Sequence, residues 1–256
     1  MQQYFNILLE FDKNLIHKSI NKTIDCGQKG YVCVVDGNVL ATATKKIEYR
    51  EIVNNALVNI CDGSSIALLA GIIHKEKLLS YTGPDIFFKY IQKSIKQYFL
   101  GNTMDNLNEL RNKFAALDYD TSLFQFESLP FQGVEQFEYE KIATKINDFK
   151  PDIIWVSLGA PKQEVFISKL YLYINQGVLF AIGAAFNLFL DNDRNRRAPL
   201  WMRKIHLEWV YRLLKEPNKA WKRVINYVFL LPKLVITEIK NTNKKILVTL
   251  LFKYII

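Results

Sequence analysis

The feature that most constrains the fold of this chain is an alternation of short apolar runs with longer helix-like segments. The apolar runs end in Gly, Pro, Asp or Asn and cover residues 31–38, 59–65, 77–85, 96–103, 151–161 and 178–186. Amphipathic stretches lie between them, among them residues 45–58, 85–95, 104–117 and 137–149. Strands that alternate with helices in this way predict an α/β fold with a mainly parallel sheet covered on both faces.

The alternation stops near residue 194, where the sequence becomes helical and basic. Residues 1–193 carry 19 Lys or Arg and 22 Asp or Glu, whereas residues 194–256 carry 15 and 3. We therefore expect an α/β domain over residues 1–195 and a helical, basic appendage over residues 196–256. Segregated positive charge indicates that the appendage meets an anionic partner: nucleic acid, a membrane surface or a phosphorylated substrate.

Several classes of protein are disfavoured by simple counts. No apolar run reaches the roughly 18–20 residues that a spanning helix needs, and the first residues do not resemble a signal peptide. The three cysteines are odd in number and show no metal-ligand spacing, which predicts reduced thiols and no metal site. The aromatic residues of the appendage fall at helical core spacing, which disfavours an open stacking surface for nucleic acid.

Candidate binding residues follow from a rule about parallel sheets, in which ligands sit beyond the carboxyl ends of the strands. The residues at those ends are rich in Gly, Asp and Asn: Asp36, Asn38, Asp62, Gly63, Gly83, Asp85, Gly101, Asn102, Gly159, Pro161, Lys162, Gln163, Glu164 and Asn187. Each also has a purely structural reading as a turn or helix-cap residue. For Asp62 as a general base, the structural reading is the stronger one from the residues alone.

Three blocks near the end of the α/β pattern share a specific resemblance. They are GAAFN at 183–187, RAPLWM at 197–202 and HLEWVYRLLKEPNKAWKR at 206–223, and GAPKQE at 159–164 precedes them. Together they resemble the signature of the WecG/TagA/CpsF glycosyltransferases, glycosyltransferase family 26, over about residues 30–225.

This resemblance implies a Rossmann-like, inverting glycosyltransferase that is peripheral on the cytoplasmic face of the cell membrane. It implies a UDP-sugar donor, often of the N-acetylmannosamine type and sometimes a hexose. The implied acceptor is a polyprenyl-diphosphate-linked sugar of cell-surface polysaccharide synthesis, and no divalent metal is expected. By position, Asp62 matches the proposed general base, Asn38 and Gln163 match further site residues, and the basic positions of the appendage are Arg212, Lys219 and Lys222. A homo-oligomer is left open.

The chain also departs from the family pattern. Asp36 stands where Thr is usual, Ser80 stands near a usual Arg, Asn187 replaces Asp, and Lys219 and Lys222 replace Arg. These departures bear on the donor sugar more than on the fold. They keep a second reading open, a degenerate sugar-nucleotide-binding or scaffolding protein without turnover.

The apolar residues of the appendage leave its partner open. Met202, Ile205, Trp209 and Leu213 form an apolar face at helical spacing, for which packing against the α/β domain is the simplest reading. Trp201 and Trp221 fit interfacial anchors equally well. Together with the positive charge, they predict that the appendage docks on an anionic bilayer and covers the bound donor.

Overall fold

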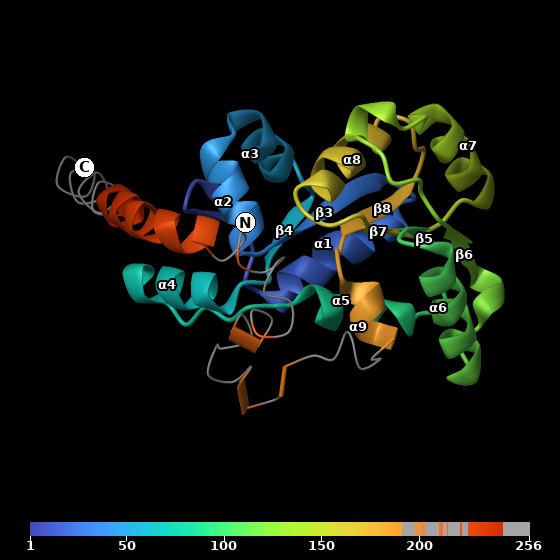
Figure 1. Cartoon of the computed structure of the whole chain (residues 1–256), viewed down its shortest axis with the longest axis horizontal. Coiled ribbons are helices and arrows are strands. Elements are labelled where there is room, and N and C mark those ends of the chain that lie inside the picture. Colours follow the sequence, from blue (N-terminus) through green and yellow to red (C-terminus); the bar gives the residue numbers. More distant parts are fainter. Residues whose placement is uncertain are drawn as a thin grey trace.

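The protein forms a central sheet enclosed by helices, as seen in a computed structural model (Figure 1). Residues 1–190 and 225–242 are described, together with the separate residues 198, 199, 201, 202, 210, 211, 214 and 221. The strands are β1 (Gln2–Tyr4), β2 (Ile7–Leu9), β3 (Lys29–Val35), β4 (Val58–Cys61), β5 (Gln97–Gly101), β6 (Phe124–Glu127), β7 (Ile153–Ser157) and β8 (Gly177–Ala181).

The helices lie between these strands. They are α1 (Lys13–Asp25), α2 (Gly37–Lys45), α3 (Ile47–Asn54), α4 (Ser64–His74), α5 (Gly83–Ile91), α6 (Met104–Ala116), α7 (Tyr139–Phe149), α8 (Lys162–Leu170) and α9 (Ala185–Leu190). Two 3-10 turns, η1 (Thr121–Leu123) and η2 (Val134–Gln136), flank β6.

Six of the strands form one sheet, in the order β4-β3-β8-β7-β5-β6, and every neighbouring pair is parallel. The remaining strands, β1 and β2, pair as an antiparallel hairpin. The predicted α/β fold with a mainly parallel sheet is therefore confirmed. The long apolar runs in the sequence are explained by burial of the sheet on both faces.

Alternate residues of each strand point into two separate cores. One core packs the sheet against α2, α3, α4, α7 and α8. The other core packs the sheet against α1, α5, α6 and α9, and it is rich in aromatic rings around Phe87, Phe99 and Trp155. The sheet therefore separates two layers of helices, and Figure 1 shows α2, α3, α7 and α8 above the strands and α5, α6 and α9 below them.

The expected strand over residues 77–85 is wrong. Residues 77–82 have no regular structure and α5 begins at Gly83. Helix-start signals explain the difference, because Thr82 caps the helix and Pro84 lies in its first turn. The sequence analysis also did not identify β6 or α2. The Asp36-Gly37 pair that reads as a turn is in fact the N-terminal cap and first residue of α2.

A further helix over residues 225–242 follows the α/β domain and packs beside α2 and α4 (Figure 1). We call it the C-terminal helix. Its Leu234 is buried in the same core as α2, α3 and α4. The predicted helical appendage is thus present, although the expected boundary near residue 195 lies outside the described residues. No helix in the described part of the chain is both long and apolar enough to cross a bilayer.

Candidate active site

Most of the predicted site residues that the structure describes lie near one another, because the six parallel strands end at one edge of the sheet. We call this the carboxyl edge. Turns after β3, β4, β5, β7 and β8 all lie there, and they carry most of the Gly, Asp and Asn residues singled out in the sequence. The start of α5 joins them although no strand precedes it.

Asp62 lies directly after β4 and faces the start of α5. Its Oδ1 accepts a hydrogen bond from the N–H of Gly83 at 3.1 Å. Gly83 in turn lies close to the side chain of Val34, since a Cβ at this glycine would sit 3.4 Å from Val34 Cγ1. Asp62 therefore accepts from the N-terminal end of a helix, where backbone N–H groups and the helix dipole stabilise negative charge. In the same turn, Thr82 Oγ1 accepts from the N–H of Asp85 at 3.3 Å.

The turn after β3 places Asp36 and Asn38 next to the turn after β7. Asp36 caps α2, and its Oδ1 accepts from the N–H groups of Asn38 and Val39, both at 2.9 Å. The Asn38 side chain reaches across to the neighbouring loop, where its Nδ2 donates to the carbonyl of Ala160 at 3.3 Å. The peptide bond between Ala160 and Pro161 is cis. Asn38 thus ties the turn after β3 to the turn after β7.

Gln163 fastens the loops that follow β7 and β8. Its Oε1 accepts from the N–H of Gly159 at 3.0 Å and from the N–H of Gly183 at 2.9 Å. Both glycines have positive φ angles, 77° and 55°, a region that glycine enters without steric cost. The Gln163 side chain is buried, so in this structure its amide oxygen holds the two loops rather than facing solvent.

Glu164 is fully buried beside Gln163 and is held by two hydrogen bonds. Its Oε1 accepts from Gln163 Nε2 and its Oε2 accepts from the hydroxyl of Tyr49, each at 2.9 Å. Burial raises the pKa of Glu164 to about 7, the charge on Asp36 raises it further, and the two hydrogen bonds oppose the shift. A carboxyl group that changes charge near neutral pH therefore lies directly behind the loops of the site.

An amide cluster fills the gap between the turn after β5 and the start of α9. Asn102 Nδ2 donates to Asn187 Oδ1 at 3.0 Å, and Asn102 Oδ1 accepts from Asn106 Nδ2 at 2.7 Å. Nearby, Ser157 Oγ donates to the carbonyl of Gly183 at 2.7 Å. Asn187, which replaces the Asp of the family pattern, serves here as a hydrogen-bond acceptor, a role that an Asp carboxylate shares.

The connections that follow two neighbouring strands leave to opposite faces of the sheet at the same place. Strands β5 and β7 are neighbours, but α6 after β5 packs on the aromatic core and α8 after β7 packs on the opposite core. Adjacent strands whose connections leave to opposite faces mark the position where ligands bind in open α/β sheets. Gly101, Asn102 and Gly159 lie at this position.

The remaining predicted residues are distributed as follows. Gly63 precedes α4 as its N-terminal cap residue. The ammonium of Lys162 lies over the rings of Phe131 and Phe137, 5.4 Å and 5.1 Å from their centroids. Arg212, Lys219 and Lys222, with Ile205, Trp209 and Leu213, lie outside the described residues. Trp201 and Trp221 are both exposed.

Some residues at this edge were not identified in the sequence. Tyr49 and Tyr227 look in the sequence like members of apolar helix faces. Only the fold brings the hydroxyl of Tyr49 to Glu164 and that of Tyr227 to Ser65. Asn106 has a local signal, since it follows Asn102 by one helical turn and shares its amide chemistry. Ser157, at the end of β7, obeys the same strand-end rule that selected its neighbours.

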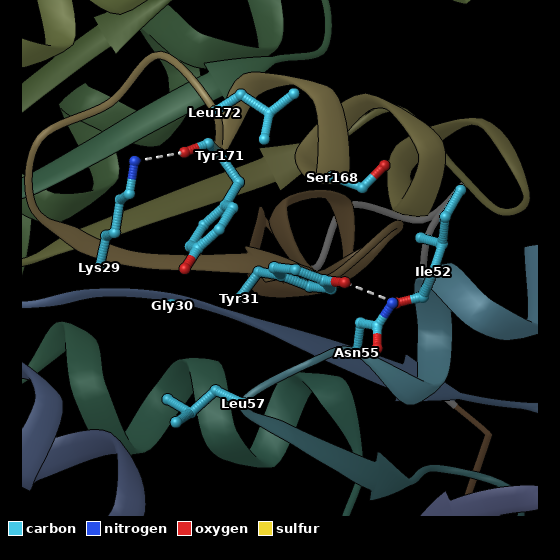
Figure 2. Close-up of a pocket in the computed structure, with 9 residues that line it drawn as sticks. All are labelled: Lys29, Gly30, Tyr31, Ile52, Asn55, Leu57, Ser168, Tyr171 and Leu172. Carbon is cyan, nitrogen blue, oxygen red and sulfur yellow. Dashed lines mark hydrogen bonds between the residues drawn. The ribbon is translucent and has the colours of Figure 1, made fainter.

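A pocket among the described residues lies at the other edge of the sheet. It has a volume of about 380 Å³ and is lined by residues from the amino end of β3, the end of α3 and the end of α8, namely Lys29, Gly30, Tyr31, Ile52, Asn55, Leu57, Ser168, Tyr171 and Leu172 (Figure 2). Its polar groups are engaged, because Lys29 Nζ donates to the carbonyls of Tyr171 and Ile174 and the Tyr31 hydroxyl donates to the carbonyl of Ile52. Because it lies at the amino end of β3, this pocket is at the opposite edge of the sheet from the candidate site.

Metal-ligating groups do not gather at either edge in the part of the chain that the structure describes. Among the described residues, no three His, Cys, Asp or Glu side chains come close enough to hold an ion. What the carboxyl edge offers instead is two carboxylates on helix N-termini, Asp36 and Asp62, with several amide groups and glycine-lined loops. Such an edge can bind a polar, anionic ligand and remove a proton from it or from a second substrate.

A parallel sheet with helices on both faces and a polar carboxyl edge defines the chain as a Rossmann-like α/β protein. Comparison with known families then gives the narrower assignment. The model of the Glycosyl transferase WecG/TagA/CpsF family matches residues 8–245. The chain belongs to this family, which confirms the resemblance seen in the sequence, and it is a glycosyltransferase.

Individual relatives support the same assignment. An N-acetylglucosaminyldiphosphoundecaprenol N-acetyl-beta-D-mannosaminyltransferase of Bacillus subtilis is 24% identical over 90% of this chain and 90% of its own length. The enzyme of the same name from Bacillus spizizenii is 26% identical over 85% of this chain and 82% of its own length. That from Staphylococcus aureus strain MRSA252 is 24% identical, over 76% and 74%.

Proposed function

We propose that this glycosyltransferase moves a sugar from a UDP-sugar to a sugar carried on a polyprenyl diphosphate, in cell-surface polysaccharide synthesis. The relatives named above transfer N-acetylmannosamine to N-acetylglucosaminyl-diphosphoundecaprenol, which favours an N-acetylmannosamine-type donor and that class of acceptor. The observation that carries the proposal is the placement of Asp62 at the carboxyl edge, beside the N-terminus of α5.

The proposed chemistry is a single displacement with inversion. Asp62 accepts the proton of the acceptor hydroxyl as its oxygen forms a bond to the anomeric carbon of the donor. The bond from that carbon to the diphosphate oxygen breaks, and UDP leaves with both bonding electrons. The hydrogen bond from the N–H of Gly83 holds the Asp62 carboxylate in place at the carboxyl edge, and a general base has to be positioned in this way.

Departure of UDP requires a stabilising positive field. The family resemblance implies no divalent metal and assigns this role to Arg212, Lys219 and Lys222 of the appendage. The N-termini of α4, α5 and α6 point their N–H groups to the same carboxyl edge, where they can add to binding of the diphosphate. The amide cluster of Asn102, Asn106 and Asn187 supplies further donors beside the switch between β5 and β7.

The protein is proposed to act at the cytoplasmic surface of the cell membrane, where a polyprenyl carrier resides. An exposed apolar surface supports this location. It is formed by the outer faces of α4 and the C-terminal helix and consists of Leu68, Ile72, Val228, Phe229, Ile236 and Ile239. The two helices are neighbours, since His74 of α4 contacts Glu238 of the C-terminal helix. Basic residues of the appendage would add attraction to anionic lipids.

The decisive experiment is turnover with a panel of UDP-sugars and a lipid-linked acceptor, followed by mass spectrometry of the product. Asp62→Asn should lower kcat by about 10²–10⁴-fold, the usual contribution of a general base, while UDP affinity changes little. Asp152→Asn is the matched control, because Asp152 also accepts one backbone N–H, from Lys96 at 2.9 Å, but at the amino end of β7. Wild-type turnover by the Asp62 variant would remove this residue from the mechanism.

One alternative has a specific motivation. The departures at Asp36, Ser80 and Asn187 fit a sugar-nucleotide-binding protein that has lost turnover. In that case UDP-sugars bind the wild-type protein, yet no donor of the panel yields a glycosylated lipid.

A further inference from the structure

The C-terminal helix reaches the candidate site through Tyr227. The aromatic ring lies against Gly37, the residue between Asp36 and Asn38. A Cβ built on Gly37 would sit 2.9 Å from Tyr227 Cγ, 3.1 Å from Cδ1 and 3.2 Å from Cδ2. Since real Cβ atoms do not approach ring carbons to 2.9 Å, the ring occupies the space that any side chain at residue 37 would need.

The hydroxyl of the same tyrosine reaches the neighbouring turn. It lies 3.2 Å from Ser65 Oγ, and either oxygen can be the donor. Ser65 is in the first turn of α4, three residues after Asp62. Strands β3 and β4 are adjacent, with Val35 paired to Cys61, so one side chain spans the turn that carries Asn38 and the turn that carries Asp62.

The far end of the C-terminal helix is fixed by Glu238. Its Oε2 accepts from the N–H of Phe5 at 2.8 Å and its Oε1 lies 2.8 Å from His74 Nε2. Glu238 is buried, which is costly for a carboxylate unless it is paired in this way. Between the two ends, Leu230 and Leu234 pack on the core. Residues 227, 230, 234 and 238 therefore form the inner face of the helix.

We propose that Tyr227 is a positioning residue of the active site, which holds the turns carrying Asn38 and Asp62 at a fixed separation by packing on Gly37 and bonding to Ser65. The C-terminal helix, held at its other end by Glu238, is the support for this side chain. The predicted effect of Tyr227 on turnover rests on the proposed role of Asp62. Its effect on the structure of the two turns does not.

A pair of opposite substitutions tests the contact. Tyr227→Ala removes the ring, whereas Gly37→Ala pushes it away. Gly37 is the first residue of α2 and does not have a positive φ, so alanine is compatible with the backbone there and the ring of Tyr227 is its close neighbour. Each single variant should lower kcat at least 10-fold with a change in KM below about 3-fold. In the Tyr227→Ala background, Gly37→Ala should cost less than 2-fold, because the clash is gone.

Two conservative variants separate positioning from general packing. Tyr227→Phe keeps the ring and loses only the hydrogen bond to Ser65. Such a bond contributes about 1 kcal/mol, so kcat should fall by no more than roughly 5-fold. Thr237→Ala is the control on the same helix, since its hydroxyl bonds back to the carbonyl of Lys233; wild-type kcat is expected. Additive effects of Gly37→Ala and Tyr227→Ala, or wild-type kcat in Tyr227→Ala, would overturn the proposal.

A second measurement on the same full-length proteins does not depend on activity. In Tyr227→Ala, amide hydrogens of residues 36–40 and 62–67 should exchange at least 10-fold faster than in the wild type, while those of β5 and β7 keep their rates. Unchanged exchange in both turns contradicts the inference even if turnover falls. Faster exchange in a protein that transfers no sugar would instead contradict the proposed function and leave the role of Tyr227 intact.

Discussion

At the scale of a single residue, Glu164 shows that a buried side chain supports the loops of the site. Its carboxyl is buried behind the loops of the carboxyl edge and is held by Gln163 and Tyr49. Because Gln163 binds Gly159 and Gly183 with its other amide atom, a change at Glu164 reaches two loops of the site through one side chain. The sequence shows this Glu as a favourable residue at a helix start, and only the fold shows that it is buried.

The raised pKa of Glu164 predicts a pH-dependent stability. Its folded pKa is about 7 against an ordinary value of 4.5. The stabilisation that the neutral carboxyl contributes is therefore at its full value below about pH 4.5 and is lost as the pH rises to 7. The free energy of unfolding of the wild type should fall over this range by up to roughly 3 kcal/mol. Glu164→Gln should lack this fall, as measured by urea unfolding at pH 5 and pH 8.

Glu109→Gln, at an exposed position of α6, is the control for this pH experiment and should follow the wild-type curve. Parallel pH curves for the wild type and Glu164→Gln would show that Glu164 keeps its charge in the folded protein.

At the scale of elements, three helices of the site, α5, α6 and α9, pack on the aromatic core on one face of the sheet. Phe99 of β5 stacks on Phe126 of β6 at 4.8 Å and contacts Phe87 of α5, Phe114 of α6 and Phe186 of α9. These three helices start at the carboxyl edge, so their N-termini are placed by the packing of rings far from any substrate.

Removal of the central ring should therefore be costly. Phe99→Ala is expected to lower the free energy of unfolding by about 3–5 kcal/mol, as measured by urea unfolding, because a fully buried ring leaves a cavity. Phe131→Ala, at an exposed phenylalanine, should change it by less than about 0.5 kcal/mol. A loss below about 1 kcal/mol for Phe99→Ala would indicate that the core collapses around the gap.

The elements differed in how well the sequence predicted them, for physical reasons. Strands β3, β5, β7 and β8 are buried on both faces, so their apolar runs are unbroken and readily identified. Strand β6 is at the edge of the sheet and exposes Gln125, which leaves a weak signal. The run over residues 77–85 is apolar because Tyr81 packs in the core, not because it pairs in a sheet.

The residues of the candidate site were selected from the sequence by their places after the strands. The strand-end rule selected Asp62, Asn102 and Gln163 from local sequence, and parallel strands do bring these turns to one edge. It could not select Tyr49 or Tyr227, which reach that edge from a helix face by contacts across the fold.

At the scale of the whole molecule, a group of exposed apolar side chains lies on two neighbouring helices. Ile72 of α4 is 65% exposed and Phe229 of the C-terminal helix is 80% exposed, and both helices lie at the β4 end of the sheet. At the opposite end of the sheet, beside β6, Leu117 follows α6 and is 52% exposed. The proposed membrane surface is therefore tied to one end of the molecule.

Membrane binding should depend on that end. Ile72→Glu and Phe229→Glu should each lower at least 3-fold the fraction of full-length protein that floats with vesicles containing anionic lipid, because a carboxylate is repelled by both the acyl region and the headgroup charge. Leu117→Glu adds the same charge at the β6 end and should float as the wild type does. Equal flotation of all three variants would place the bilayer contact elsewhere.

The bond between Phe5 and Glu238 also sets an order of assembly. The two residues are 233 positions apart, and at 5–20 residues per second a ribosome needs roughly 10–50 s to make the chain between them. The hairpin and α4 are therefore made well before their partner helix, and β8, which completes the central sheet, is made between them. Joining ends across so long a chain costs little extra entropy per added residue. We therefore expect the C-terminal helix to dock after β8 has been made, and Tyr227 to reach the site only once that helix is in place.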